Sequence, residues 1–441
     1  MHQTKDLEQP TNFKIYNGKE LYSLIERLYP ICRSITGNGV RQTLSILQEY
    51  IPLQLHEVAS GTKVFDWTVP KEWNIDDAYI RDSTGTKIVD FKESNLHVVN
   101  YSIPVNKKIT LQELKNHLHS LPEHPDWIPY RTSYYNETWG FCLPHSRVEA
   151  MKDETYEVYI DSSLTEGHLT YGEYFIPGST NEEVLFSSHV CHPSLCNDNL
   201  SGITVMTHLA KILKEMNLRY SYRFIFIPAT IGSITWLALN KEKTNTIKHG
   251  LVAANLGDEG NMTYKRSRRG NSGVDRVVEI MLRDSGQPYT VKDFFPYGYD
   301  ERQFCSPGFN LPVGSIMRTP HGQYPEYHTS ADNLEFVKPD KLEDSYRKLY
   351  TVVDTLENNK TYKNTNPYCE PQLGKRGLYK HIGGGDTKID QLAILWMLNM
   401  SDGTHSVLDI AERSGIRFSK LKAATDILIQ YKLLEEVPSV N

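Results

Sequence analysis

Val184-Leu-Phe-Ser-Ser-His-Val-Cys-His-Pro-Ser-Leu-Cys-Asn-Asp-Asn-Leu-Ser-Gly202 joins a short apolar strand to a loop rich in metal-binding residue types. The loop carries His189, His192 and Asp198, and an apolar helical pattern follows from 203 to 213. In α/β proteins, sites form in the crevice at the carboxyl ends of the strands, and His and Asp are common zinc ligands there. This segment therefore predicts an α/β fold and half of a metal site.

Strand and helix patterns alternate on both sides of this segment, from about residue 156 to 358. Such alternation is typical of a parallel or mixed sheet with helices on both faces. We therefore expect an α/β main domain with a mixed, mostly parallel sheet, discontinuous in sequence over residues 1–52 and 140–365. The expected strands are 157–160, 168–175, 183–187, 222–227, 250–255 and 311–316.

Two further segments depart from this pattern. Residues 53–139 hold short alternating runs separated by Gly, Pro, Asn and Asp, which predicts an inserted, small β-rich domain. Residues 375–441 contain three helical patterns and a terminal apolar run, the outline of a winged-helix domain. Its expected recognition helix, from Arg417 to Thr425, has three cations, but the segment also carries several acids. Because phosphate contacts dominate DNA affinity, we expect a packing or oligomerisation module and no nucleic-acid partner.

The composition narrows the class of protein. The chain has 441 residues, 23% of them charged, and a formal net charge of −6, so no global attraction to nucleic acid or anionic membranes is expected. The amino terminus lacks a signal-peptide pattern and no apolar run reaches membrane-spanning length. We therefore expect a cytoplasmic protein with no membrane partner.

The six cysteines are scattered, and a cytoplasmic location makes a disulfide framework improbable. Cys191 and Cys196 interleave with His189 and His192, which raises the alternative of a structural zinc site built from these four residues. Four ligands within eight residues leave little chain to wrap a tetrahedral ion. Buried free thiols are the favoured interpretation.

Other candidate groups follow further predicted strands. Asp258 comes after the strand that ends near Asn255, and His328 lies in a downstream loop. With His189 and Asp198 they make two imidazoles and two carboxylates, each beside a strand end. Such a set suits zinc, and a carboxylate can bridge two ions in co-catalytic hydrolases.

These motifs resemble those of the zinc aminopeptidases of M28 type. The chain is especially similar to the bacterial aminopeptidase-like family (DUF4910/DUF2172), which has an inserted β domain and a carboxyl-terminal winged helix. The resemblance covers nearly the whole chain. Its most specific segments are 189–202, 257–260, 296–308 and 327–333.

The resemblance implies a role for each candidate ligand. His189 would ligate one zinc, Asp198 would bridge two, and Asp258 with His328 would hold the other. The family has a general-base acid and an acidic ligand at the two positions occupied here by Ala229 and Thr230. Since Ala229 cannot accept a proton and Thr230 is a poor zinc ligand, we expect one tightly bound zinc, with two as the alternative, and a weakened or absent activity.

Further residues are candidates by their place in the sequence. In addition to the base position at Ala229, Asp300, Arg302 and His321 are candidate catalytic groups. A structural ion pair or a satisfied loop histidine would give the same pattern. A basic run after Asp258 could bind a carboxylate or phosphate, and a solvated charged turn is its equal alternative. The candidate substrate-binding residues are Arg266, Arg268, Arg269, Tyr299, Glu301 and Tyr327.

The resemblance implies a zinc-dependent hydrolase that cleaves an amide bond in a small peptide or aminoacyl conjugate. Two alternatives stay open: a catalytically silent protein that keeps the pocket for ligand binding or assembly, and a deacylase or acyl-transfer enzyme acting on an amino sugar or metabolite. We also expect a homo-oligomer.

Overall fold

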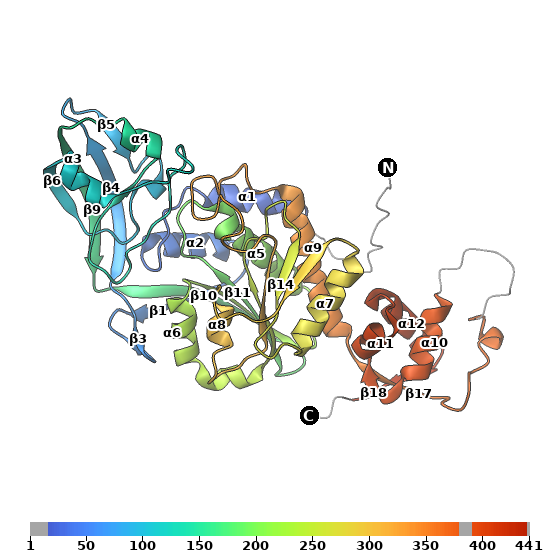
Figure 1. The fold of residues 1–441 in the computed structure, drawn as a ribbon. Coiled ribbons are helices and arrows are strands. Elements are labelled where there is room, and N and C mark those ends of the chain that lie inside the picture. The colour runs from blue at the N-terminus through green and yellow to red at the C-terminus, as the bar shows by residue number, and fades with distance from the viewer. Residues whose placement is uncertain (1–15, 379–389, 439–441) are drawn as a thin grey trace, which may run out of the picture.

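The computed structural model describes residues 16–378 and 390–438. Its centre is an eight-stranded sheet, and the expected mixed α/β fold is confirmed (Figure 1). Strands β12, β11, β13 and β16 run parallel to one another. β10 is antiparallel to both β1 and β12, and β14 is antiparallel to β16 but parallel to β15. In spatial order the strands are β1 (Gln54–Ala59), β10 (His168–Ile176), β12 (Ser221–Ile227), β11 (Glu183–His189), β13 (Ile247–Ala253), β16 (Val313–Met317), β14 (Met262–Lys265) and β15 (Tyr289–Lys292).

The central strands are buried because helices cover both faces of the sheet. Every residue of β11 and β12 is buried, and their apolar residues follow one another instead of alternating with polar ones, as in Val184-Leu-Phe186 and Phe224-Ile-Phe-Ile227. On one face Val184 and Phe186 join a core with the long helices, and on the other Leu185 and Ile225 join a second core. The helices of the main domain are α1 (Gly18–Leu28), α2 (Asn38–Gln48), α5 (Gly202–Leu213), α6 (Ile231–Leu239), α7 (Gly273–Ser285), α8 (Glu301–Phe304) and α9 (Pro339–Asn358).

The inserted β-rich domain has its own antiparallel sheet, in the order β5 (Lys87–Asp90), β4 (Glu72–Arg81), β9 (Thr155–Thr165) and β6 (Val105–Thr110). Its boundaries differ from the predicted 53–139 at both ends. At the start, β1 pairs with β10 in the main sheet, and at the end β9 pairs with β4 along nine residue pairs. Its smaller elements are β2 (Lys63–Val64), β3 (Trp67–Thr68), α3 (Leu111–Leu114), β7 (Leu118–His119), β8 (Phe141–Cys142) and α4 (His145–Glu149).

The carboxyl-terminal domain has the predicted winged-helix outline. Helices α10 (Gln391–Met400), α11 (Val407–Ser414) and α12 (Phe418–Gln430) pack beside a three-stranded sheet of β18 (Asp402–Ser406), β17 (Thr361–Asn364) and β19 (Leu434–Glu436). Because β17 is the central strand of that sheet, the domain begins near residue 361 and not at 375.

The winged helix lies against α7 of the main domain (Figure 1). Arg276 on α7 pairs with Asp409 and Glu412, both at 2.6 Å. The backbone N–H of Phe418, at the start of α12, donates to Asp284 at 2.7 Å. The first turn of the expected recognition helix is therefore bound to the main domain. Within the described part of the chain, no helix is long and apolar enough to cross a membrane.

Candidate metal centre

The candidate metal centre lies at the carboxyl end of β11. His189 is the last residue of that strand, and Asp198 lies in a kinked turn, Cys196–Ser201, that leads into α5. The backbone of Asp198 and Asn199 in this turn is not helical. Both side chains are withdrawn from solvent, His189 with 1% of its side-chain surface exposed and Asp198 with none. A buried carboxylate is costly unless it is paired, so this position requires partners.

Three imidazoles converge on the Asp198 carboxylate. His189 Nε2 lies 2.8 Å from Oδ1, and His328 Nε2 lies 3.0 Å from Oδ2. His192 Nδ1 lies 3.7 Å from Oδ2, and the ligand atoms of His189, His192 and Asp198 all lie within 4.8 Å of one another. The structure thus brings together three of the predicted ligands, His189, Asp198 and His328, and adds His192, which the family resemblance did not imply as a ligand.

The chemistry of this group fits a zinc-type cation. Burial alone would raise the pKa of Asp198, but the nearby His192 and His189 and hydrogen bonds from His189 and His328 hold that pKa well below its usual range. Burial lowers the pKa of His192 to about 3, so its imidazole is neutral and able to ligate. His192 Nδ1 is buried without a hydrogen-bond partner among the described residues. Neutral imidazoles around a carboxylate are a usual zinc donor set.

Hydrogen bonds hold the turn Cys196–Ser201 in place. The backbone N–H groups of Asn197 and Asp198 donate to the Asp332 carboxyl at 2.6 and 3.0 Å. The side-chain amide of Asn199 donates to Ser188 Oγ at 2.9 Å and to Ala253 O at 3.1 Å. Burial raises the pKa of Asp332 to about 8. The turn that aims Asp198 is therefore braced from β11, β13 and the loop that carries His328.

Aromatic rings flank the imidazoles. Tyr299 stacks on His189 with ring centroids 5.2 Å apart, and Tyr327 stacks on His328 at 4.0 Å. Tyr130 packs edge-on against His192 at 5.2 Å and against His328 at 5.1 Å. These contacts restrict the rotation of each ring, which preserves the direction of its nitrogen lone pair.

Tyr130 comes from the inserted domain, and its loop is joined to the loop of His328. The N–H of Tyr130 donates to the carbonyl of His328 at 2.7 Å. Two positions away on each loop, Ser330 N donates to Ile128 O at 2.8 Å and Ile128 N donates to Ser330 Oγ at 2.9 Å. Tyr130 was not among the predicted site residues. The one available signal was the aromatic-rich composition of residues 127–139.

Asp258 is not brought into this group. Its buried carboxylate accepts hydrogen bonds from Asn197 Nδ2 at 2.9 Å, Gly260 N at 2.7 Å and Thr319 Oγ1 at 2.6 Å, and Thr319 N lies 3.2 Å away. These contacts use both oxygens of the carboxylate to join three loops.

The alternative four-residue zinc site does not form either, since Cys191 Sγ donates to the carbonyl of Ala229 at 3.8 Å.

The expected base position offers no acid, but a buried carboxyl from another loop, that of Asp300 at the start of α8, is hydrogen-bonded to the start of α6. Ala229 packs against the second core. Ser233 Oγ, at the start of α6, lies 2.8 Å from Thr230 O and 2.7 Å from Asp300 Oδ1. Asp300 is fully buried, its Oδ2 has no hydrogen-bond partner among the described residues, and burial raises its pKa to about 6. Burial therefore favours the protonated form of Asp300 more than it would be favoured in an exposed aspartate.

The remaining predicted catalytic and substrate-binding residues lie in two separate parts of the main domain. Glu301 forms a buried ion pair with Lys265, and Arg302 lies over the ring of Tyr297 at 5.8 Å. His321 lies among three tyrosine rings, and burial lowers its pKa. These residues are on the loops around Tyr299, whose ring contacts His189.

The three arginines lie elsewhere. Because β14 runs antiparallel to β16, the chain after Lys265 emerges at the amino edge of the parallel strands, opposite the metal-binding group. There Arg266 pairs with Glu279 and Asp293, while Arg268 and Arg269 donate to Asn310. Proximity in sequence to Asp258 did not translate into proximity in space.

The mixed sheet, the helices on both faces and the His–Asp group at the carboxyl edge define an aminopeptidase-like α/β fold. The likeness extends to a zinc aminopeptidase structure from Bacillus subtilis, which is 12% identical, with 78% of this chain and 96% of that chain covered and a TM-score of 0.58.

The chain belongs to the family described as a domain of unknown function (DUF4910), whose model matches residues 22–359. A winged helix-turn-helix model matches residues 360–436, in agreement with the inclusion of β17 in that domain. The predicted family and the predicted winged helix are both confirmed.

Two matches come from Clostridium acetobutylicum. One, provisionally named a polysaccharide biosynthesis protein with aminopeptidase-like domain, is 57% identical over 421 residues, with 95% of this chain and 97% of that protein covered. The other is a crystal structure of a provisionally assigned peptidase, 56% identical, with 95% of this chain and 96% of that chain covered and a TM-score of 0.91.

Proposed function

We propose that this protein is a zinc-dependent hydrolase that cleaves an amide bond in a small peptide or aminoacyl conjugate, and that Ala229 weakens its activity. The observation that carries the proposal is the convergence of three imidazoles on the buried Asp198 carboxylate, in an aminopeptidase-like fold. The names of the two matches refer to an aminopeptidase-like domain and to a peptidase, which supports this class of reaction.

His189, Asp198 and His328 would hold the metal, with His192 as a further ligand. A bound zinc supplies Lewis acidity, which polarises a carbonyl and lowers the pKa of water. We propose a single ion, because Asp258, the expected ligand of a second ion, is engaged by Asn197, Gly260 and Thr319.

The residues around the group would exclude water and manage the proton. Tyr130, Tyr299 and Tyr327 surround the imidazoles, and their rings limit the space to a small substrate group. Ala229 cannot accept a proton, and a well-placed base contributes about 10²–10⁴-fold to such reactions. Asp300, joined to the Ala229 loop through Ser233, is the carboxyl that we propose accepts the proton in its place, at a lower rate.

A metal analysis joined to an activity assay tests the proposal. Purified protein should contain stoichiometric zinc after dialysis, and His189→Ala should lose it, while His168→Ala, which alters an exposed histidine on β10, should keep it. Hydrolysis of aminoacyl p-nitroanilides should be slow and should be removed by a chelator and by His189→Ala. Parent protein without bound zinc would contradict the metal assignment, and zinc-loaded protein with no activity on a broad amide panel would favour the silent ligand-binding alternative.

A second candidate, deacylation of an amino sugar, has one observation in its favour. The curated relative from Clostridium acetobutylicum carries a name that refers to polysaccharide biosynthesis. Because the reaction is also amide hydrolysis, the same metal group would serve it. N-acetylated sugars in the substrate panel separate the two candidates.

A further inference from the structure

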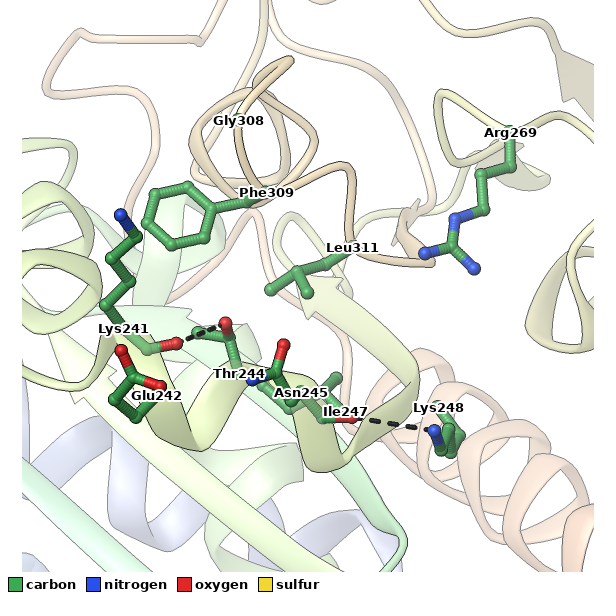
Figure 2. Close-up of a pocket in the computed structure, with 10 residues that line it drawn as sticks. All are labelled: Lys241, Glu242, Thr244, Asn245, Ile247, Lys248, Arg269, Gly308, Phe309 and Leu311. Atoms are coloured by element: carbon green, nitrogen blue, oxygen red, sulfur yellow. Dashed lines mark hydrogen bonds between the residues drawn. The ribbon is translucent and has the colours of Figure 1, made fainter.

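A cavity lies at the opposite edge of the sheet from the metal-binding group. It has a volume of about 300 Å³ and is formed by the 3-10 segment Lys241–Thr246, the start of β13, Arg269 and the segment 308–311 (Figure 2). Ile247 pairs with Glu183 at the start of β11, whereas His189 ends that strand. At about 3.3 Å per residue, the cavity is roughly 20 Å from the metal-binding group. A small ligand cannot occupy both places.

The cavity is rich in cations. Lys241 and Lys248 reach it from one wall and Arg269 from the other, and Glu242 is the acid that also lines it (Figure 2). Within residues 16–378 and 390–438, none of the three cations has an ion-pair partner. Arg269 Nε donates to the carbonyl of Asn310 at 2.8 Å, which anchors the guanidinium at the cavity wall. An anion is the complementary ligand, because charge-assisted hydrogen bonds to guanidinium and ammonium groups are strong.

An aromatic groove adjoins the cavity. It has a volume of about 360 Å³, shares Lys241 and Phe309 with the cavity, and is also lined by Phe65 and Trp67 of the β2–β3 hairpin. Phe65 exposes 57% of its surface and Trp67 47%, and the Phe65 and Phe309 rings meet edge-on at 5.9 Å. Asp66 at the hairpin tip also lines the groove. Exposed aromatic rings beside cations offer flat apolar faces and charge within one continuous site.

We propose that this composite cleft binds a saccharide that carries a phosphate or carboxylate group. The anion would pair with Lys248 and Arg269, and the apolar face of the sugar ring would lie on Phe309 and Trp67. A neutral peptide would leave the cations without partners, and a bare phosphate would leave the aromatic rings uncovered. The proposal is independent of the reaction at the metal-binding group, since it rests on other residues at the other edge of the sheet.

Calorimetric titration of the full-length protein tests the proposal with four probes: glucose 1-phosphate, glucuronate, glucose and inorganic phosphate. Glucose 1-phosphate should bind at least tenfold more tightly than either glucose or inorganic phosphate. Glucuronate distinguishes the sources of the anion: binding by both charged sugars indicates recognition of the shared charge, and binding by one identifies phosphate or carboxylate. Failure of both charged sugars to bind, or equal binding of glucose 1-phosphate and inorganic phosphate, would overturn the proposal.

Variants locate the binding. The double variant Lys248→Glu with Arg269→Glu should lose at least tenfold in affinity for glucose 1-phosphate, while Lys243→Glu, an exposed neighbour outside the cavity, should retain most of it. Trp67→Ala should weaken glucose 1-phosphate and leave inorganic phosphate unchanged. His189→Ala should bind like the parent, so failure of the metal proposal and failure of this one are distinguishable. Equal losses in the double variant and in Lys243→Glu would place the ligand elsewhere.

Discussion

The inserted domain contributes the ring of Tyr130 to the surroundings of the metal-binding group. Removal of this ring is the most informative single change. Tyr130 is 6% exposed, and its ring packs edge-on against His192 and His328. Tyr130→Ala removes that ring but keeps the backbone hydrogen bond to His328 O. Truncating a buried aromatic residue to alanine costs about 3–5 kcal/mol of stability. Loss of outer contacts around a metal site lowers metal affinity on the order of 10–100-fold.

Two companion variants separate the ring from its other effects. Tyr130→Phe removes only the hydroxyl, which lies 3.3 Å from the Tyr134 hydroxyl, and should cost about 1 kcal/mol with little change in metal affinity. Tyr156→Ala removes a fully buried ring from the core of the inserted domain. That core contains none of the three imidazoles of the metal-binding group. It should destabilise the protein to a similar extent and leave the metal affinity intact.

Competition with a chromophoric zinc chelator measures the affinity, and denaturant unfolding measures the stability. The absorption spectrum of cobalt-substituted protein reports directly on ligand geometry and should change in Tyr130→Ala alone. If Tyr130→Ala bound zinc as tightly as the parent, or if Tyr156→Ala lost affinity equally, the ring would have no specific role in positioning His192 and His328.

Three further changes test other parts of the structure. Ala229→Glu should raise amide hydrolysis by about 10²–10⁴-fold in zinc-loaded protein, and an unchanged rate would remove the base assignment at this position. Since burial raises the pKa of Asp300 from 3.8 to about 6, its contribution to stability is full below pH 4 and is lost as the pH rises through 6, by about 3 kcal/mol. Asp300→Asn should therefore flatten this part of the pH–stability profile measured by denaturant unfolding in a chelator, and a parallel profile would contradict it. Arg276→Ala should increase proteolysis at the junction of α7 and the winged helix without altering zinc content, because its partners Asp409 and Glu412 hold that junction.

The fold class followed from local patterns in the chain. Alternating strand and helix signals, the apolar run that ends at His189, and the short β-type segments of the insertion all reflect contacts with near neighbours in sequence. The same is true of the placement of Asp198 in a loop after a buried strand. Domain boundaries were less accurate, because β1, β9 and β17 belong to sheets whose partner strands lie far away in the sequence.

The membership of the metal-binding group depended on the tertiary structure. Asp258 follows a strand end as a ligand would, yet hydrogen bonds from Asn197 and Thr319 engage its carboxylate. His192 entered the site because its imidazole lies 3.7 Å from the Asp198 carboxylate, and Tyr130 because its loop is hydrogen-bonded to that of His328. The arginines after β14 reached the other edge because that strand is antiparallel to β16.

The segment 184–202 thus carried the fold class and three of the converging residues, His189, His192 and Asp198, since strand, loop and helix signals are local properties of the chain. Which distant side chains complete the group was a matter of strand direction and loop packing. Those depend on contacts between residues more than a hundred positions apart, such as His328 with Asp198, and no periodicity in the sequence encodes them.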